Sequence, residues 1–149
     1  MKMKTVLHCF VVLLLCAANA WSSPAASAEE IRQLIVQQQN AWNRGDLEAF
    51  MSGYWNSPDL TFFSGAHESK GWQAALDRYK KSYQSAGHEM GKLEFASLQV
   101  EMLGTDAAFV RGEFHLVMSD GKTPHGLFTL IFRKFPEGWK IIHDHSAGE

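Results

Sequence analysis

The sequence predicts an α+β domain in which three helices are followed by a mainly antiparallel sheet. Apolar residues recur at the helical spacing of three and four in the first half of the chain. From Lys92 onwards the spacing changes to two, the period of a strand with one buried face. Short segments rich in glycine, aspartate and proline separate the later apolar runs, as in a meander. A length of 149 residues, 46% of them hydrophobic, suffices for one domain with a sizeable core.

Residues 1–20 have the features of a secretory signal peptide. Two lysines precede an apolar run, and small residues follow it. The run is far shorter than the ~20 residues that span a bilayer, so we expect a cleaved signal and no membrane attachment afterwards. Cleavage is expected after Ala20, which leaves 21–28 as a short leader, and cleavage after Ala28 is the alternative. The mature protein would be periplasmic or secreted.

The composition of the mature chain excludes several classes of protein. Both cysteines, Cys9 and Cys16, belong to the predicted signal, so the exported domain would have no disulfide and no cysteine metal ligand. Loss of Lys2 and Lys4 reduces 14 basic residues to 12 against 16 acidic ones, a net charge of −4. A nucleic-acid-binding protein needs a basic face, so we expect no nucleic-acid partner. No cofactor is expected either.

The first helix is predicted over about 28–43. Ser27 and Glu30 have the spacing of a capping box at its start. Gln38 falls in the middle of the apolar stripe of this helix, so its amide requires a buried hydrogen-bond partner.

The rest of the chain follows from turn signals and periodicity. A change of parity between Phe95 and Leu98 predicts a bulge near Ala96-Ser97 and a bent sheet. The remaining predicted elements are helices at about 47–55 and 71–85, a strand at 60–64, a polar loop at 65–71, and strands beginning at 92, 107, 124 and 139.

The predicted hairpins divide the sheet into a polar face and an apolar face. If Met118 pairs with Pro124 and Phe135 with Trp139, alternate residues fall on opposite sides. The first face mixes acids, bases and imidazoles: Glu113, Thr129 and His145 form one row, Arg111, Ile131 and His143 form the next, and His115 lies beside Leu127. The second face is nearly apolar: Val110, Phe114, Phe128, Leu130 and Phe132, with Asp144 at one end. Packing of the apolar face on the helices, with the polar face in water, is the simplest arrangement.

Several segments resemble the nuclear transport factor two-like superfamily. They are Ala41-Trp42-Asn43-Arg44-Gly45-Asp46-Leu47-Glu48-Ala49-Phe50, the strand with Phe62, the helix starting at Gly71-Trp72, and Gly138-Trp139-Lys140-Ile141-Ile142-His143-Asp144-His145-Ser146. The similarity is to a bacterial branch near the SnoaL-like polyketide cyclases and the ketosteroid isomerases. It covers about 29–146 and leaves 147–149 as a tail. This fold carries enzymes, binding domains and assembly hubs, so the resemblance indicates fold more strongly than function.

The resemblance implies a cone with a central pocket and a homodimer through the outer face of the sheet. On this basis the polar face would line the cone, and the apolar face would form the dimer surface. The pocket would hold a small molecule with an aromatic, uncharged body. Its predicted ligand-binding residues are Gln38, Tyr54, Trp55, Phe62, Ser64, Tyr79, Arg111, His115 and Thr129.

The predicted catalytic residues are His145, His143 and Glu113. Glu113 and His145 would lie ~10 Å apart across Thr129, a separation that a substrate or water can bridge. An imidazole near its usual pKa and a carboxylate suit general acid–base chemistry. The alternative is that these groups only satisfy one another in a polar layer. They include zinc-ligand types, but they match no metal-binding motif, and no metal is expected.

The resemblance also excludes one mechanism. The tyrosine, base and acid positions of a ketosteroid isomerase fall on Gln38, Ser64 and a position near Ile131. Neither the base nor the acid is retained. Three functions therefore remain: an exported small-molecule-binding protein, an enzyme of the cyclase, dehydratase or isomerase type, and a partner-binding module.

Overall fold

A computed structural model describes residues 23–85 and 90–149. The predicted signal peptide, its cleavage after Ala20 and the first two residues of the leader, Trp21 and Ser22, lie outside these residues. The described part confirms the α+β prediction. Its helices and strands, in chain order, are α1 Pro24–Asn43, α2 Leu47–Met51, β1 Thr61–Ser64, β2 His67–Lys70, α3 Trp72–Tyr83, β3 Lys92–Met102, β4 Ala107–Val117, β5 His125–Phe135 and β6 Gly138–Gly148.

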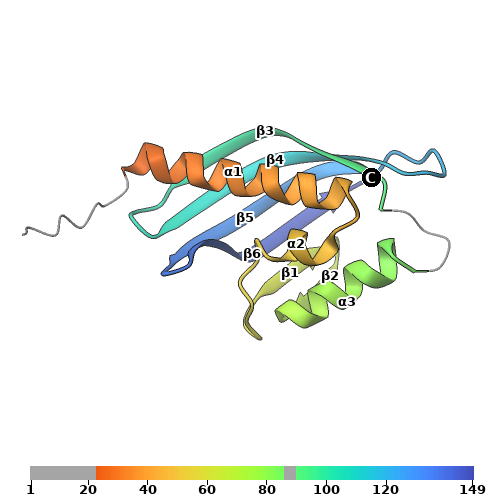
Figure 1. Cartoon of the computed structure of the whole chain (residues 1–149), viewed down its shortest axis with the longest axis horizontal. Coiled ribbons are helices and arrows are strands. Elements are labelled where there is room, and N and C mark those ends of the chain that lie inside the picture. The colour runs from red at the N-terminus through yellow and green to blue at the C-terminus, as the bar shows by residue number, and fades with distance from the viewer. Residues whose placement is uncertain (1–22, 86–89) are drawn as a thin grey trace, which may run out of the picture.

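The strands form one sheet in the order β2-β1-β6-β5-β4-β3. Strand β1 is parallel to β6, and the other neighbouring pairs are antiparallel. Helix α1 runs along one face of the long strands, while α2 and α3 lie towards β1 and β2 (Figure 1). The sheet is curved and is not closed into a barrel. The space between α1, α3 and the sheet is where the chain builds its core.

Helix α1 begins earlier than its sequence predicts. The side chain of Ser23 accepts a hydrogen bond of 3.2 Å from the backbone N–H of Ala26, and Pro24 occupies the first turn. Proline suits this position because its missing N–H would have no helical partner there. Ser27 is therefore not the cap, and its side chain is buried inside the helix. The capping-box prediction was wrong because a second serine lies four residues upstream.

Strand β2 occupies a segment predicted to be a polar loop. Its four residues have no apolar alternation, and most of them are exposed. It pairs only with β1, as an edge strand, so backbone hydrogen bonds rather than side-chain burial define it. Helix α2 is also shorter than predicted and ends at Met51.

Two irregularities in pairing shape the sheet. The register of β3 and β4 shifts between Ala96 and Gln99, where Ser97 has a φ of 54°, which confirms the predicted bulge. A second shift, which the sequence did not predict, leaves Ile142 of β6 without a partner on β5. Ile141 and Asp144, which are three residues apart, therefore lie on the same face of the sheet.

The hairpin registers are partly as predicted. Thr129 lies opposite His145, as expected, but His115 lies opposite His125 instead of Leu127. That shift of two residues keeps each side chain of β4 and β5 on its predicted side.

The implied assignment of the two faces was wrong. The apolar face packs towards the helices, where Val110 and Phe132 are wholly buried and Leu130 is 5% exposed. The polar face points away from the helices, with Arg111 and His145 exposed. Burial of apolar surface decides this orientation, because each buried large side chain contributes about 1.5–3 kcal/mol. The predicted dimer surface is therefore the inner wall of the domain.

Candidate ligand pocket

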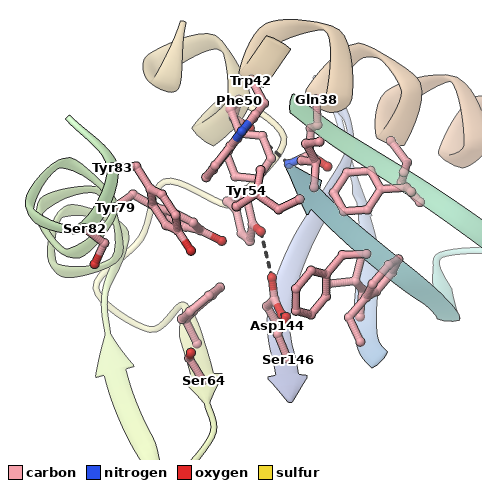
Figure 2. Close-up of a pocket in the computed structure, with 18 of the residues that line it drawn as sticks. Gln38, Trp42, Phe50, Tyr54, Ser64, Tyr79, Ser82, Tyr83, Asp144 and Ser146 are labelled. Atoms are coloured by element: carbon pink, nitrogen blue, oxygen red, sulfur yellow. Dashed lines mark hydrogen bonds between the residues drawn. The ribbon is translucent and has the colours of Figure 1, made fainter. Parts of the chain in front are cut away.

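A cavity of about 160 Å³ lies between the helices and the inner face of the sheet. Helix α1 contributes Gln38 and Trp42 to its wall, and α3 contributes Tyr79, Ser82 and Tyr83 (Figure 2). The sheet closes the opposite side with a mostly apolar surface, to which Phe95, Phe114, Leu116, Phe128 and Leu130 contribute. The cavity thus occupies the position that the resemblance implied, but the other face of the sheet lines it.

Aromatic side chains form one continuous wall of the cavity. The ring centres of Trp42 and Tyr83 are 4.8 Å apart, and those of Phe50 and Tyr79 are 5.4 Å apart. Phe62 extends the wall from β1, 5.5 Å from Tyr79. All three pairs meet edge to face, an arrangement that stabilises aromatic clusters beyond their burial alone. Such a wall favours a flat, apolar ligand.

Asp144 is the single acidic residue among the described residues that line the cavity. It is only 3% exposed. Its Oδ2 accepts a hydrogen bond of 2.7 Å from the hydroxyl of Tyr54, and its Oδ1 accepts one of 2.8 Å from Ser146. Burial raises the pKa of Asp144 to about 6, and the two hydrogen bonds oppose that rise because they stabilise the charged form. The carboxyl group therefore changes its protonation near neutral pH.

Two tyrosines accompany this carboxyl group. Burial, followed by the nearby charge of Asp144, raises the pKa of both Tyr54 and Tyr79 well above the usual value. Both phenols consequently stay neutral at physiological pH and act as hydrogen-bond donors. Figure 2 shows the Tyr54 hydroxyl directed at Asp144, with Tyr79 across the cavity from β6.

Gln38 has the buried partner that its position required. Its Nε2 donates a hydrogen bond of 3.0 Å to the carbonyl oxygen of Phe50. Gly53 packs against the same amide, and a Cβ at that glycine would lie 2.7 Å from it. This contact fixes the end of α2, and with it the chain that leads to Tyr54.

The structure brings together only some of the predicted ligand-binding residues. Gln38, Tyr54, Phe62, Ser64 and Tyr79 line the cavity. The others lie elsewhere: Trp55 stacks on Phe135, and Arg111, His115 and Thr129 belong to the outer face.

The predicted catalytic residues lie outside the cavity. His143 and His145 face outwards on β6, where both rings contact the ring of Phe63. His143 shares a hydrogen bond of 2.6 Å with Thr61, and burial together with the nearby His145 lowers its pKa. Glu113 lies opposite Leu127, and its Oε2 is 3.4 Å from Nε2 of His115. The predicted row of Glu113, Thr129 and His145 does not form.

The sequence analysis placed Asp144 at one end of the apolar face and not among the predicted site residues. The signal that marks it was present, since it is the one acidic residue on an otherwise apolar sheet face. Arg78, Ser82 and Tyr83 were missed because the pattern of α3 does not show which side faces a cavity. No group of three or more metal-ligating side chains lies together within residues 23–85 and 90–149.

A family comparison accounts for this architecture. A SnoaL-like domain matches residues 31–147. The chain belongs to the SnoaL-like domain family, within the nuclear transport factor two-like superfamily. No match among curated proteins was found. In the described part of this SnoaL-like protein, no helix is both long and apolar enough to cross a membrane.

Solved structures similar to this SnoaL-like protein share its fold. An NTF-2 like protein of unknown function from Shewanella oneidensis MR-1 is 39% identical, with a TM-score of 0.74, over 80% of this chain and 97% of its own. An NTF2-like protein of unknown function from Pseudomonas putida KT2440 is 24% identical, with a TM-score of 0.69, over 84% of this chain and 87% of its own. A putative aromatic ring hydroxylase from Novosphingobium aromaticivorans is 17% identical, with a TM-score of 0.70, over 85% of this chain and 91% of its own.

Proposed function

We propose that this SnoaL-like protein binds a small, ring-bearing molecule in its aromatic cavity, with one polar group of the ligand hydrogen-bonded to Asp144. The observation that carries the proposal is a buried carboxyl group, 3% exposed, on the mostly apolar sheet side of the cavity. Burial of such a group is costly unless it is satisfied, and an apolar residue would serve a purely structural core better. Tyr54 and Ser146 each use one lone pair of the carboxylate, which leaves further acceptor capacity for a ligand.

The size of the cavity sets the size of the ligand. An apolar cavity of about 150 Å³ in another protein binds benzene. The cavity of about 160 Å³ therefore accommodates one ring, with substituents extending towards its open side. A phenol fits this description, because its ring matches the aromatic wall and its hydroxyl can donate to Asp144.

Phenol itself is a suitable probe, measured by isothermal titration calorimetry. Ser64→Phe places a ring on the cavity wall and should abolish binding, because Ser64 lines the cavity. Thr129→Phe makes the same kind of change on the outer face and should leave binding within twofold. Absence of phenol binding to the wild type at millimolar concentration, or equal binding to both variants, would contradict the proposal.

A second candidate function is acid–base catalysis by Asp144. The observation that favours it is the pKa of about 6, which lets the group give and take a proton at neutral pH. The neutral phenols of Tyr54 and Tyr79 would stabilise negative charge that develops on a substrate oxygen. This chemistry suits an isomerase, a dehydratase or a cyclase.

Exchange of the α-protons of cyclohexanone for deuterium, followed by NMR, tests the catalytic candidate with a defined probe. Asp144→Asn should remove any exchange that the protein catalyses, whereas His145→Ala should leave it unchanged because His145 lies outside the cavity. Exchange that depends on His145 and not on Asp144 would refute this assignment.

Export by a cleaved signal peptide and homodimerisation through the outer face remain proposals. The dimer surface would now be the polar face of β4, β5 and β6, where Leu127 is 66% exposed.

A further inference from the structure

Arg78 is the single cation among the described residues that line the cavity. Within residues 23–85 and 90–149 it makes no ion pair and no hydrogen bond. Its contact is with an aromatic ring, since its guanidinium carbon lies 5.8 Å from the centre of Phe62. Lys80, two residues further along the same helix, instead pairs with Glu48 at 3.4 Å. Of the three cations on α3, Lys80 and Lys81 lie outside the cavity wall, and Arg78 lies at it without an anionic side-chain partner among the described residues.

The guanidinium of Arg78 is accessible to a molecule in the cavity. No buried side-chain nitrogen or oxygen in the described part of the chain lacks a hydrogen-bond partner. Because Arg78 has no such partner, its guanidinium must be exposed to water or to a ligand. The side chain as a whole is half-buried, so its charge is only partly screened.

Arg78 does not act as the counter-ion of Asp144. The groups that set the pKa of Asp144 are its buried surroundings, Tyr54 and Ser146, and the charge of Arg78 is felt instead by Tyr79 and Tyr83. Phe62 is paired with Asp144 across β1 and β6, while the guanidinium lies over its ring. The cavity is therefore bordered by two polar groups of opposite charge that do not neutralise each other.

We propose that the ligand is a ring-bearing carboxylic acid whose carboxylate pairs with Arg78. This inference rests on the proposed function and adds the charge of the ligand to it. A guanidinium binds a carboxylate through two parallel hydrogen bonds, which a compact ammonium group cannot reproduce. Ser82 lies one turn further along α3 and also lines the cavity, so its hydroxyl can donate to the same carboxylate. The ring then occupies the aromatic wall, and a hydroxyl on its far side donates to Asp144.

The number of donors favours a carboxylate over a phosphate. A phosphate carries more charge and more acceptor oxygens, and it is ordinarily bound by several cations or by a helix N-terminus. Here the guanidinium of Arg78 is the single cationic donor among the described residues of the cavity wall, the other donors are neutral, and Asp144 adds a negative charge above pH ~6. A single carboxylate matches this supply of donors.

The test compares 4-hydroxybenzoate with 4-hydroxybenzamide, a neutral molecule of nearly the same shape, by calorimetry at about pH 8. Wild-type protein should bind the acid about tenfold more tightly than the amide, the preference expected of a partly exposed charged hydrogen bond. Arg78→Gln should bind the two equally, with its affinity for the amide within twofold of wild type. Arg78→Lys should show an intermediate preference.

Lys80→Gln is the matched control, because it removes a cation from the same helix outside the cavity. It should keep the full preference for the acid. Equal binding of acid and amide by wild type, or a preference that survives in Arg78→Gln, would overturn the inference while the proposed binding function stands. Failure of wild type to bind either molecule at millimolar concentration would overturn both.

Discussion

The hydroxyl group of Tyr54 donates a 2.7 Å hydrogen bond to Oδ2 of Asp144, across a separation of 90 residues in the chain. This bond ties the segment after α2 to the last strand at the wall of the cavity. It also holds a carboxyl group in a position that burial alone would disfavour. The polar chemistry of the cavity therefore depends on the contact between these two side chains.

Tyr54→Phe should destabilise the protein and raise the pKa of Asp144 further. The substitution removes a hydrogen bond that favours the charged carboxylate, and such bonds contribute about 1.5–3 kcal/mol. Urea unfolding measures the first effect, and NMR titration of the Asp144 carboxyl carbon measures the second. A pKa that stays the same or falls would show that the hydrogen bond does not stabilise the charge.

Asp144 should make stability fall as the pH rises from about 4 to 6. Its pKa is raised from 3.8 to about 6 on folding, so the folded state holds the proton more tightly than the unfolded state. The stabilisation is fully present below the pKa of the unfolded state and is lost as the pH rises through the pKa of the folded state. The free energy of unfolding should fall in total by an amount on the order of 3 kcal/mol. Asp144→Asn should remove this slope in urea unfolding at several pH values. Asp59→Asn changes an exposed aspartate, should leave the slope unchanged and serves as the control.

Gly53→Ala should destabilise the protein through a clash with Gln38. The added methyl group would lie 2.7 Å from the Gln38 amide, and overpacking of this kind costs about 1–3 kcal/mol. Gln38→Ala makes room for the methyl group. The free energy of unfolding should therefore fall less in the double variant than the sum of its decreases in the two single variants. A double-mutant cycle by urea unfolding measures the coupling. Strict additivity would mean that the two residues do not interact.

Leu127→Glu should convert the proposed homodimer into a monomer. Leu127 is 66% exposed on the outer face, and a carboxylate there would be desolvated by a partner sheet. Light scattering after size-exclusion chromatography gives the mass of each form. Arg44→Glu changes charge at a surface residue far from that face along the chain, at the end of α1, and should leave the mass unchanged. A wild-type monomer, or a dimer in Leu127→Glu, would contradict the proposed interface.

Local pattern predicted the elements that bury apolar side chains. Helix α1 ends at Asn43, the end that the sequence predicts, and the parity change at Ala96-Ser97 marks the bulge in β3. The four residues of β2 gave no signal, because an exposed edge strand buries no regular set of side chains. Ser27 looked like a cap because its spacing to Glu30 fits, but an upstream serine and proline supply a better one.

The sequence by itself determined which residues of β4 and β5 share a face, because alternation along a strand is a local property. It also determined the family, through segments that fix the helices and the last strand. The tertiary structure decided which face meets the helices, since that depends on the summed burial of side chains from distant segments. It also decided the parity of β6, where one unpaired residue, Ile142, places Ile141 and Asp144 on the same inner side. Asp144 lines the cavity because the apolar face on which it lies meets the helices, whereas His143 and His145 face outwards.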